Sequence, residues 1–151
     1  MDPIDETARL EELAALVPVL EEPGAVFGRW EAQWEDVEGR VHLPYFESGP
    51  ACDAFRAAVG RGGWLIVGFD WPTWARTDEA QALWKDPAAL AAATPDQLAR
   101  FLTALIRSER FSEGTLDEAF ESGLLARIAR RAAVLAAEVR TDGGGGPAQR
   151  G

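Results

Sequence analysis

Two pairs of residues in the second half of the chain, Asp86-Pro87 and Thr94-Pro95, are strong signals for the start of a helix. The Asp or Thr side chain can accept hydrogen bonds from the free N–H groups of a first helical turn, and proline fits that turn because its missing N–H needs no partner. Gln97 completes a capping box with Thr94. The second half of the chain is therefore predicted to fold as a series of helices.

Apolar residues at helical spacing extend this prediction toward both ends of the chain. Asp2-Pro3 predicts a first helix, and its apolar face comprises Leu10, Leu13, Leu16, Val17 and Leu20. Pro18 should bend or end that helix, since a proline cannot donate to the carbonyl four residues earlier. Further helices are expected over residues 98–107, 115–120 and 124–139. A second capping box, Thr115 with Glu118, should open the middle one.

The spacing of apolar residues changes to two over 26–34 and 41–46, which predicts two strands joined by a polar turn. A short apolar run at residues 64–67 is interpreted as a third strand. We therefore expect an α+β fold: a three-stranded, largely antiparallel sheet covered by about six helices. A single globular domain should span residues 1–140, and the glycine-rich residues 141–151 should form a disordered tail.

The 151 residues are enough for one domain, and 47% of them are hydrophobic. Six Trp and seven Phe supply large side chains for a core. Trp30, Trp64 and Phe101 each lie on the apolar face of an expected element, so we predict that all three are buried.

The net charge of −10 comes from the first half of the chain: residues 1–80 hold 16 acids and 6 bases, whereas residues 81–151 hold 9 of each. Such a chain repels phosphate backbones, so direct binding to nucleic acid is not expected. Fourteen of the 15 basic residues are Arg, whose planar group suits carboxylate and phosphate. An arginine-based anion site therefore stays open.

Cys52 is the single cysteine, which excludes an internal disulfide, and His42 is the single histidine, which excludes the usual Cys/His zinc sites. His42 is interpreted as a surface residue rather than a catalytic base. Ser48-Gly49-Pro50 is expected to open a helix with Cys52 on its apolar face, where burial should raise the pKa of the thiol. No cofactor, metal site or membrane association is predicted, and an acidic N-terminus without an apolar leader indicates a cytoplasmic protein.

A carboxylate stands among large aromatic residues at Phe69–Trp74. Asp70 can be an acid or a hydrogen-bond acceptor in an aromatic-walled cleft formed with Trp71 and Trp74. In the simpler interpretation, Asp70 caps the next helix and the aromatic residues belong to the core.

A second cluster follows the helix over 98–107. Arg107 and Arg110 can together hold an anion or an acidic partner surface, although a helix C-terminus favours cations anyway and Glu113 can neutralise them. We hypothesise that Asp70 approaches one of these arginines, since a carboxylate between aromatic rings needs a partner. The candidate binding cluster comprises Asp70, Trp71, Trp74, Arg107, Arg110, Phe111 and Glu113.

The order of these motifs resembles that of the domain of unknown function 6508 family of small bacterial proteins. The resemblance covers residues 8–135 and rests on Pro44-Tyr45-Phe46, Phe69-Asp70-Trp71-Pro72, Arg107 to Phe111 with Glu113-Gly114, and Ala119-Phe120-Glu121-Ser122-Gly123. It implies a compact domain and supplies no catalytic residue. It also favours one spatial feature made of Asp70, Trp71, Arg107, Phe111 and Glu113.

These features predict a non-enzymatic binding or protein-interaction module with a protein or small-molecule partner. Two alternatives stay open: an enzyme acting on a small substrate in the aromatic-walled cleft, and an acidic decoy that mimics nucleic acid. An enzyme needs polar side chains that converge on a pocket, and a decoy needs carboxylates spaced like phosphates. An interaction module needs an exposed apolar patch.

Overall fold

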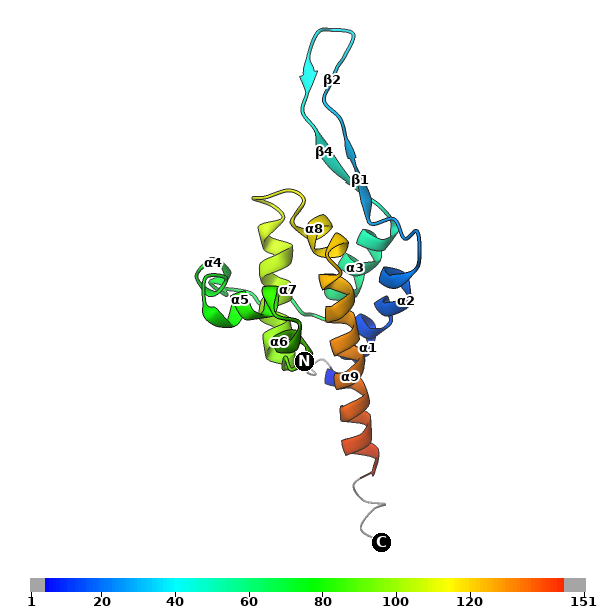
Figure 1. The fold of residues 1–151 in the computed structure, drawn as a ribbon, viewed down its shortest axis with the longest axis vertical. Helices are drawn as coiled ribbons and strands as arrows, with labels where there is room; N and C mark the ends of the chain where they lie inside the picture. Colours follow the sequence, from blue (N-terminus) through cyan, green and yellow to red (C-terminus); the bar gives the residue numbers. More distant parts are fainter. Residues whose placement is uncertain (1–4, 146–151) are drawn as a thin grey trace.

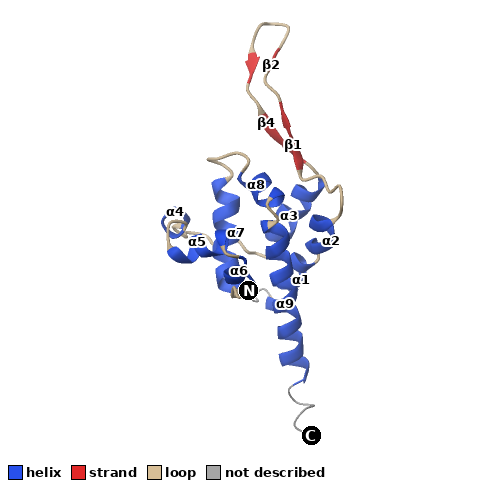
Figure 2. Cartoon of the chain, viewed as in Figure 1, coloured by secondary structure: helices blue, strands red, loops and turns tan. Residues whose placement is uncertain are grey.

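A helical body carries a projecting β-hairpin (Figure 1), and helices account for most of the chain (Figure 2). The computed structural model describes residues 5–145, with side chains as far as residue 141. In chain order the elements are α1 (Glu6–Ala14), α2 (Leu16–Glu21), β1 (Gly28–Glu31), β2 (Trp34–Glu35), β3 (Val41–His42), β4 (Tyr45–Ser48), α3 (Pro50–Arg61), α4 (Trp71–Trp74), α5 (Asp78–Lys85), α6 (Pro87–Ala91), α7 (Pro95–Ser108), α8 (Thr115–Glu121) and α9 (Leu124–Gly145). The α+β class predicted from the sequence is confirmed.

Helix α9 runs along the helical body (Figure 1), and α1, α2, α6, α7 and α8 all pack against it. Its buried side chains are Leu124, Leu125, Ile128, Ala129, Ala132, Leu135 and Ala136. They share one apolar core with Leu10 and Leu13 of α1 and with Leu102 of α7. Within the described residues, no helix is both long enough and apolar enough to cross a membrane.

The strongest helix starts predicted from capping residues are confirmed. Thr94 and Gln97 form both bonds of a capping box, at 3.1 and 2.9 Å, where α7 begins. Asp86 accepts a hydrogen bond of 3.0 Å from the first turn of α6. The capping box predicted at Thr115 is wrong, because Gly114, at φ 103°, precedes α8 and the Thr115 hydroxyl donates to a carbonyl earlier in the loop.

Other helix boundaries lie near their predicted positions. Helix α1 begins after Asp5, which caps it, while the Asp2-Pro3 start lies outside the described residues. The break predicted near Pro18 separates α1 from α2. Helix α9 continues past Val139, where its apolar spacing ends, and residues 146–151 of the predicted tail also lie outside the described range.

The β-hairpin, called the β-arm below, spans residues 26–48. At its base β1 pairs with β4, from Gly28 opposite Ser48 to Glu31 opposite Tyr45, and farther out β2 pairs with β3, all antiparallel. The first two predicted strands are therefore neighbours, as expected. The expectation that helices cover them is wrong, because the arm extends away from the helical body (Figure 1).

The third predicted strand, residues 64–67, is wrong: the segment is a loop after α3, and it pairs with no strand in the described part of the chain. Trp64 is fully buried, with the Arg9 guanidinium 3.8 Å from the centre of its ring. The Ile66 N–H donates to Thr103 Oγ1 of α7 at 3.0 Å. A helix side chain thus satisfies a backbone group that a strand partner would otherwise satisfy. Two separate two-stranded sheets replace the expected three-stranded one.

The prediction that Trp30, Trp64 and Phe101 are buried is confirmed for two of these residues. Trp64 and Phe101 are buried, as predicted, but Trp30 is 48% exposed. Trp30 lies at the base of the β-arm, where its Nε1 donates to Asp117 Oδ2 of α8 at 3.4 Å. Phe27, which precedes β1, enters the core instead. Burial does not alternate along β1, because Arg29 and Trp30 are both exposed, so the two-residue spacing does not mark a core-facing side of this strand.

Candidate ligand-binding site

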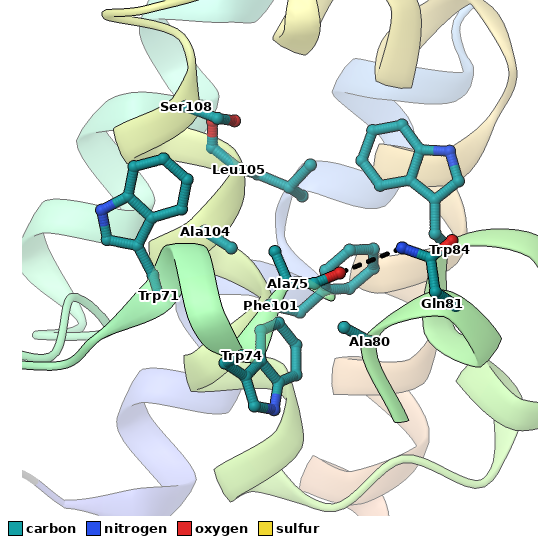
Figure 3. Close-up of a pocket in the computed structure, with 10 residues that line it drawn as sticks. All are labelled: Trp71, Trp74, Ala75, Ala80, Gln81, Trp84, Phe101, Ala104, Leu105 and Ser108. Carbon is teal, nitrogen blue, oxygen red and sulfur yellow. Dashed lines mark hydrogen bonds between the residues drawn. The ribbon is translucent and has the colours of Figure 1, made fainter. Parts of the chain in front are cut away.

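An aromatic pocket of about 140 Å³ lies between α4, α5 and α7 (Figure 3). The residues that shape it most are Trp71, Trp74, Trp84, Phe101, Leu105 and Ser108. Three indole rings and one phenyl ring therefore line a small space that is open on one side. Among the described residues, no charged side chain lines it.

The short helix α4 positions two of these rings. Asp70 caps the helix, since its carboxylate accepts hydrogen bonds from the Thr73 N–H at 3.2 Å and from the Thr73 hydroxyl at 2.8 Å. Pro72 fits the first turn because it needs no N–H partner there. Trp74 is buried, and its ring centroid lies 6.4 Å from that of Phe101. The capping interpretation of Asp70 is confirmed.

The polar side chains at the pocket, Gln81 and Ser108, each donate one hydrogen bond to a backbone carbonyl. The Gln81 amide donates to the Ala75 carbonyl at 3.0 Å, and the Ser108 hydroxyl donates to the Leu105 carbonyl at 3.1 Å. The Gln81 Oε1, the second N–H of its amide and the lone pairs of Ser108 Oγ remain as polar groups. In Figure 3 the indole nitrogen of Trp71 lies on the outer side of its ring. The pocket therefore offers aromatic faces and oxygen acceptors.

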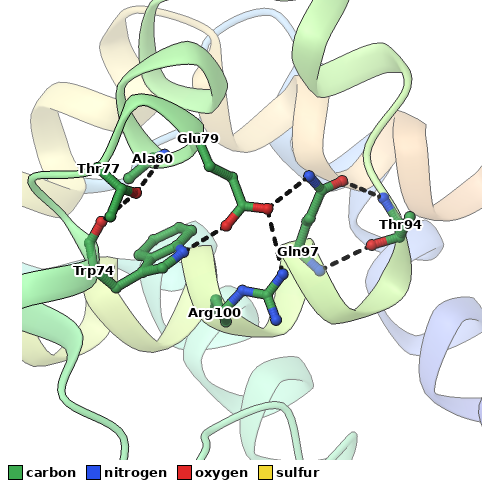
Figure 4. A network of polar contacts seen from close by, with 7 residues as sticks. All are labelled: Trp74, Thr77, Glu79, Ala80, Thr94, Gln97 and Arg100. Carbon is green, nitrogen blue, oxygen red and sulfur yellow. Dashed lines mark hydrogen bonds and ion pairs between the residues drawn. The ribbon is translucent and has the colours of Figure 1, made fainter.

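Glu79 joins α5 to α7 beside the pocket. Its carboxylate accepts hydrogen bonds from Trp74 Nε1 at 2.7 Å and from Gln97 Nε2 at 2.9 Å, and it pairs with Arg100 at 3.4 Å (Figure 4). The hydrogen bonds from Gln97 and Trp74 lower the pKa of the Glu79 carboxyl. Because an ionised acceptor polarises the group that donates to it, the Trp74 ring gains negative potential.

A second cavity, of about 420 Å³, lies between α3, α7 and the base of the β-arm. Arg56 of α3, Arg107 of α7 and Arg110 from the following loop line it, so we call it the arginine cavity. Glu109 and Glu113 also belong to its lining.

The predicted binding cluster is divided between the two cavities. Its members on the aromatic pocket are Trp71 and Trp74, and those on the arginine cavity are Arg107, Arg110 and Glu113. The hydrogen bonds of Asp70 go to Thr73, and no direct bond joins Asp70 to either arginine in the part of the chain that the structure describes. Phe111 is 81% exposed, with its ring centroid 6.2 Å from that of Trp71.

Sequence reasoning missed Trp84, Glu79 and Glu109. The apolar spacing of α5 could have placed Trp84 on its inner face. Glu109 accepts hydrogen bonds from the Gly114 and Leu116 N–H groups, both at 2.9 Å, and so fixes the loop between α7 and α8. No local pattern signals such a contact, because the loop geometry creates it.

The single His contacts other residues of the β-arm, and the single Cys is buried in the core. The His42 ring stacks on Trp34 at 4.0 Å, and its Nε2 lies 3.0 Å from Asp36 Oδ2, an interaction that lowers the pKa of Asp36. Cys52 is buried, and burial raises its pKa, as predicted. In the described range, no group of three or more His, Cys, Asp and Glu side chains is placed to hold a metal ion.

Comparison with known proteins returns one family. The sequence profile of a family of unknown function (DUF6508) matches residues 6–138, a range that includes all the motifs behind the resemblance noted above. No curated protein and no solved structure matches the chain.

Proposed function

The chain belongs to the DUF6508 family, a family of unknown function, and we propose that it is a non-enzymatic binding module whose aromatic pocket receives a methylated ammonium group. The lining of the pocket carries this proposal: three indole rings, a phenyl ring and oxygen acceptors, without a charged side chain from the described residues. Proton transfer and nucleophilic attack need a titratable or activated group beside the substrate. The Ser108 hydroxyl, which donates to a backbone carbonyl, has no adjacent base among the lining residues.

Aromatic faces attract cations through the ring quadrupole, and indole does so best. The Trp74 ring is the most favourable of them, because its N–H donates to the ionised Glu79. A primary ammonium is strongly hydrated, and this pocket has few acceptors with which to replace its water. A methylated ammonium presents its charge through apolar methyl groups, which the indole and phenyl rings can contact directly.

The size of the pocket supports one headgroup as the ligand rather than a whole cofactor. Its volume of about 140 Å³ lies below the roughly 300–1,000 Å³ of sites for drug-sized molecules. A choline-like small molecule and a methylated side chain of a partner present the same chemistry. The net charge of −10 also favours the approach of cations.

Choline and its neutral isostere 3,3-dimethyl-1-butanol test the proposal, with tryptophan fluorescence as the readout. We expect choline to bind saturably and about tenfold or more tightly than the isostere, since desolvated cation–π contacts contribute about 2 kcal/mol. Trp84→Leu removes one aromatic face but keeps the wall apolar, so it should remove most of this preference.

Trp34→Leu, in the β-arm, is the matched control and should leave choline binding unchanged. Equal affinities for the two probes would overturn the proposal. So would equal effects of the two substitutions.

The β-arm supports a second candidate function, association with a second copy of this chain. Its exposed large apolar side chains are Val26, Trp30, Trp34, Val37, Val41, Leu43 and Tyr45. The outer edges of its strands are unpaired within the described residues. Its charges are largely satisfied within the arm, as in the pairs Arg29–Glu47 at 3.3 Å and Arg40–Asp36 at 3.0 Å. An apolar arm with open edges is self-complementary, which suits pairing about a two-fold axis.

Molar mass in solution, measured by light scattering over a range of concentrations, tests this second candidate. We expect a concentration-dependent dimer that the double substitution Trp34→Ser, Leu43→Ser abolishes. Val134→Ser, at an exposed position on α9, is the control and should leave the dimer intact. A monomer at all concentrations would exclude association through the arm.

We also propose a cytoplasmic location and partners other than nucleic acid. The free, buried Cys52 suits a reducing compartment, and the excess of acids repels phosphate backbones. The decoy alternative has less support, because arginines already engage acids on separate elements, such as Glu12, Glu21 and Glu79.

A further inference from the structure

Most arginines of this acidic chain have partners. Those that form ion pairs with carboxylates are Arg9, Arg29, Arg40, Arg61, Arg100, Arg130 and Arg140. Arg127 and Arg131 donate to backbone carbonyls. Arg56, Arg76, Arg107 and Arg110 have neither kind of partner among the described residues, and all of them except Arg76 line the arginine cavity. Three of these four unpaired arginines therefore gather at one place on a chain whose net charge is −10.

The three arginines reach the cavity from different elements. Arg56 projects from α3, Arg107 from the last turn of α7 and Arg110 from the loop that follows. Like charges that face a shared space repel one another, and an anion between them would turn this repulsion into attraction. The cavity volume of about 420 Å³ lies within the roughly 300–1,000 Å³ typical of small-molecule sites.

The two acids at the cavity, Glu109 and Glu113, form no ion pair with these arginines among the described residues. Both carboxylate oxygens of Glu109 are engaged, Oε2 by the Gly114 N–H and Oε1 by the Leu116 N–H, each at 2.9 Å. Glu113 is exposed and forms no ion pair within the part of the chain described. Because Glu109 also fixes the loop, Arg110 is attached to an ordered segment next to Arg107.

The cavity has two chemical regions. Its apolar lining comprises Phe46, Cys52, Leu65, Ile106 and Leu116. Cys52 and Leu116 are buried, whereas Arg56 and Arg110 are exposed, so the apolar region lies deeper and the cationic region lies toward solvent. A ligand with a charged head and an apolar body matches this arrangement.

We propose that the arginine cavity binds a small organic oxyanion, with its carboxylate or phosphate held by Arg56, Arg107 and Arg110 and its apolar body placed against Leu65 and Ile106. Guanidinium groups suit both headgroups, because their paired N–H donors match two oxygens at once. The site shares no lining residue with the aromatic pocket, so it stands apart from the methylated-ammonium proposal.

Hexanoate and hexyl phosphate are the probes, with hexan-1-ol as the neutral control, and calorimetric titration of the full chain is the measurement. We expect at least one of the anions to bind saturably and about tenfold or more tightly than the alcohol, a difference that one charge-assisted hydrogen bond supplies. The anion that binds more tightly identifies the headgroup. If neither anion exceeds the alcohol, the proposal is wrong.

Arg107→Gln and Arg110→Gln should each weaken anion binding about tenfold. Arg76→Gln is the matched control, because it removes the same charge from an exposed position outside the cavity. An equal loss with Arg76→Gln would assign the effect to net charge and overturn the site. Choline binding should be unchanged in all three variants, so failure here is distinguishable from failure of the aromatic-pocket proposal, and their melting temperatures report on folding.

Discussion

Among single residues, Thr103 is a buried polar side chain on which the loop after α3 depends. Its hydroxyl accepts the Ile66 N–H at 3.0 Å and donates to the Ala99 carbonyl at 2.7 Å. Thr103→Val keeps the shape but leaves that N–H without an acceptor, so we expect the free energy of unfolding to fall by about 1–3 kcal/mol. Urea denaturation measures the change. Thr103→Ser keeps the hydroxyl and should lose less, and equal losses would mean that the hydrogen bond contributes little.

Glu79 makes stability depend on pH. Hydrogen bonds from Gln97 and Trp74 lower the pKa of its carboxyl from the ordinary value of 4.5. Because folding favours the charged form, this contribution is fully present above pH 4.5 and is lost as pH falls through the lowered pKa. Glu79→Gln should therefore have a melting temperature that falls less steeply below about pH 4.5 than that of the wild type. If the melting temperatures of the two proteins fell equally steeply below this pH, the account would be wrong.

Contacts between residues close together in the sequence could be predicted, whereas contacts between distant segments could not. The caps at Asp70, Asp86 and Thr94 were predictable, since each bonds within three residues. Glu109 and Trp30 were not, because their partners are set by loop shape and by the docking of the β-arm on α8. The candidate cluster was split for a related reason: spacing along one segment does not show which side of α7 a distant segment approaches.

At the scale of elements, the β-arm differs most from the prediction. An alternating pattern shows that a strand has two unlike faces, but it does not show whether helices cover either face. The base of the arm is anchored on the helical body, where the Phe27 ring stacks on Phe120 of α8 at 4.8 Å. Farther out, Trp34 stacks on His42 within the arm itself. Aromatic pairs inside a hairpin can thus give the same sequence pattern as a covered sheet.

Gly114, the residue before α8, packs against Trp30 at the base of the β-arm. It has a φ of 103°, and a Cβ atom added to it would lie 2.7 Å from Trp30 Cζ2. We expect Gly114→Ala to lower the free energy of unfolding by more than about 1 kcal/mol, since backbone strain and steric overlap add. Gly24→Ala is the control, because its φ is 80° but no atom lies within 4 Å of the added Cβ. Equal losses in urea denaturation would show that contact with Trp30 adds no cost.

At the scale of the whole molecule, α7 serves both cavities. Leu105 and Ser108 line the aromatic pocket, whereas Ile106 and Arg107 line the arginine cavity. Successive residues of a helix turn by about 100°, so one amphipathic helix can present different chemistry on neighbouring sides. Phe46 brings the β-arm into the wall of the arginine cavity. The proposed oxyanion site and the arm therefore share a boundary.

The contacts of the last turns of α9 show which C-terminal residues contribute to the stability of the fold. Leu135 and Ala136 are buried in the core, whereas Arg140 is exposed and pairs with a glutamate of α1 at 2.6 Å. Deleting residues 141–151 keeps all of these contacts, so we expect the melting temperature to stay unchanged within error. Deleting residues 135–151 removes buried apolar surface and should lower it by many degrees or prevent folding. A clear loss of stability from the shorter deletion would show that residues beyond 140 dock on the helical body.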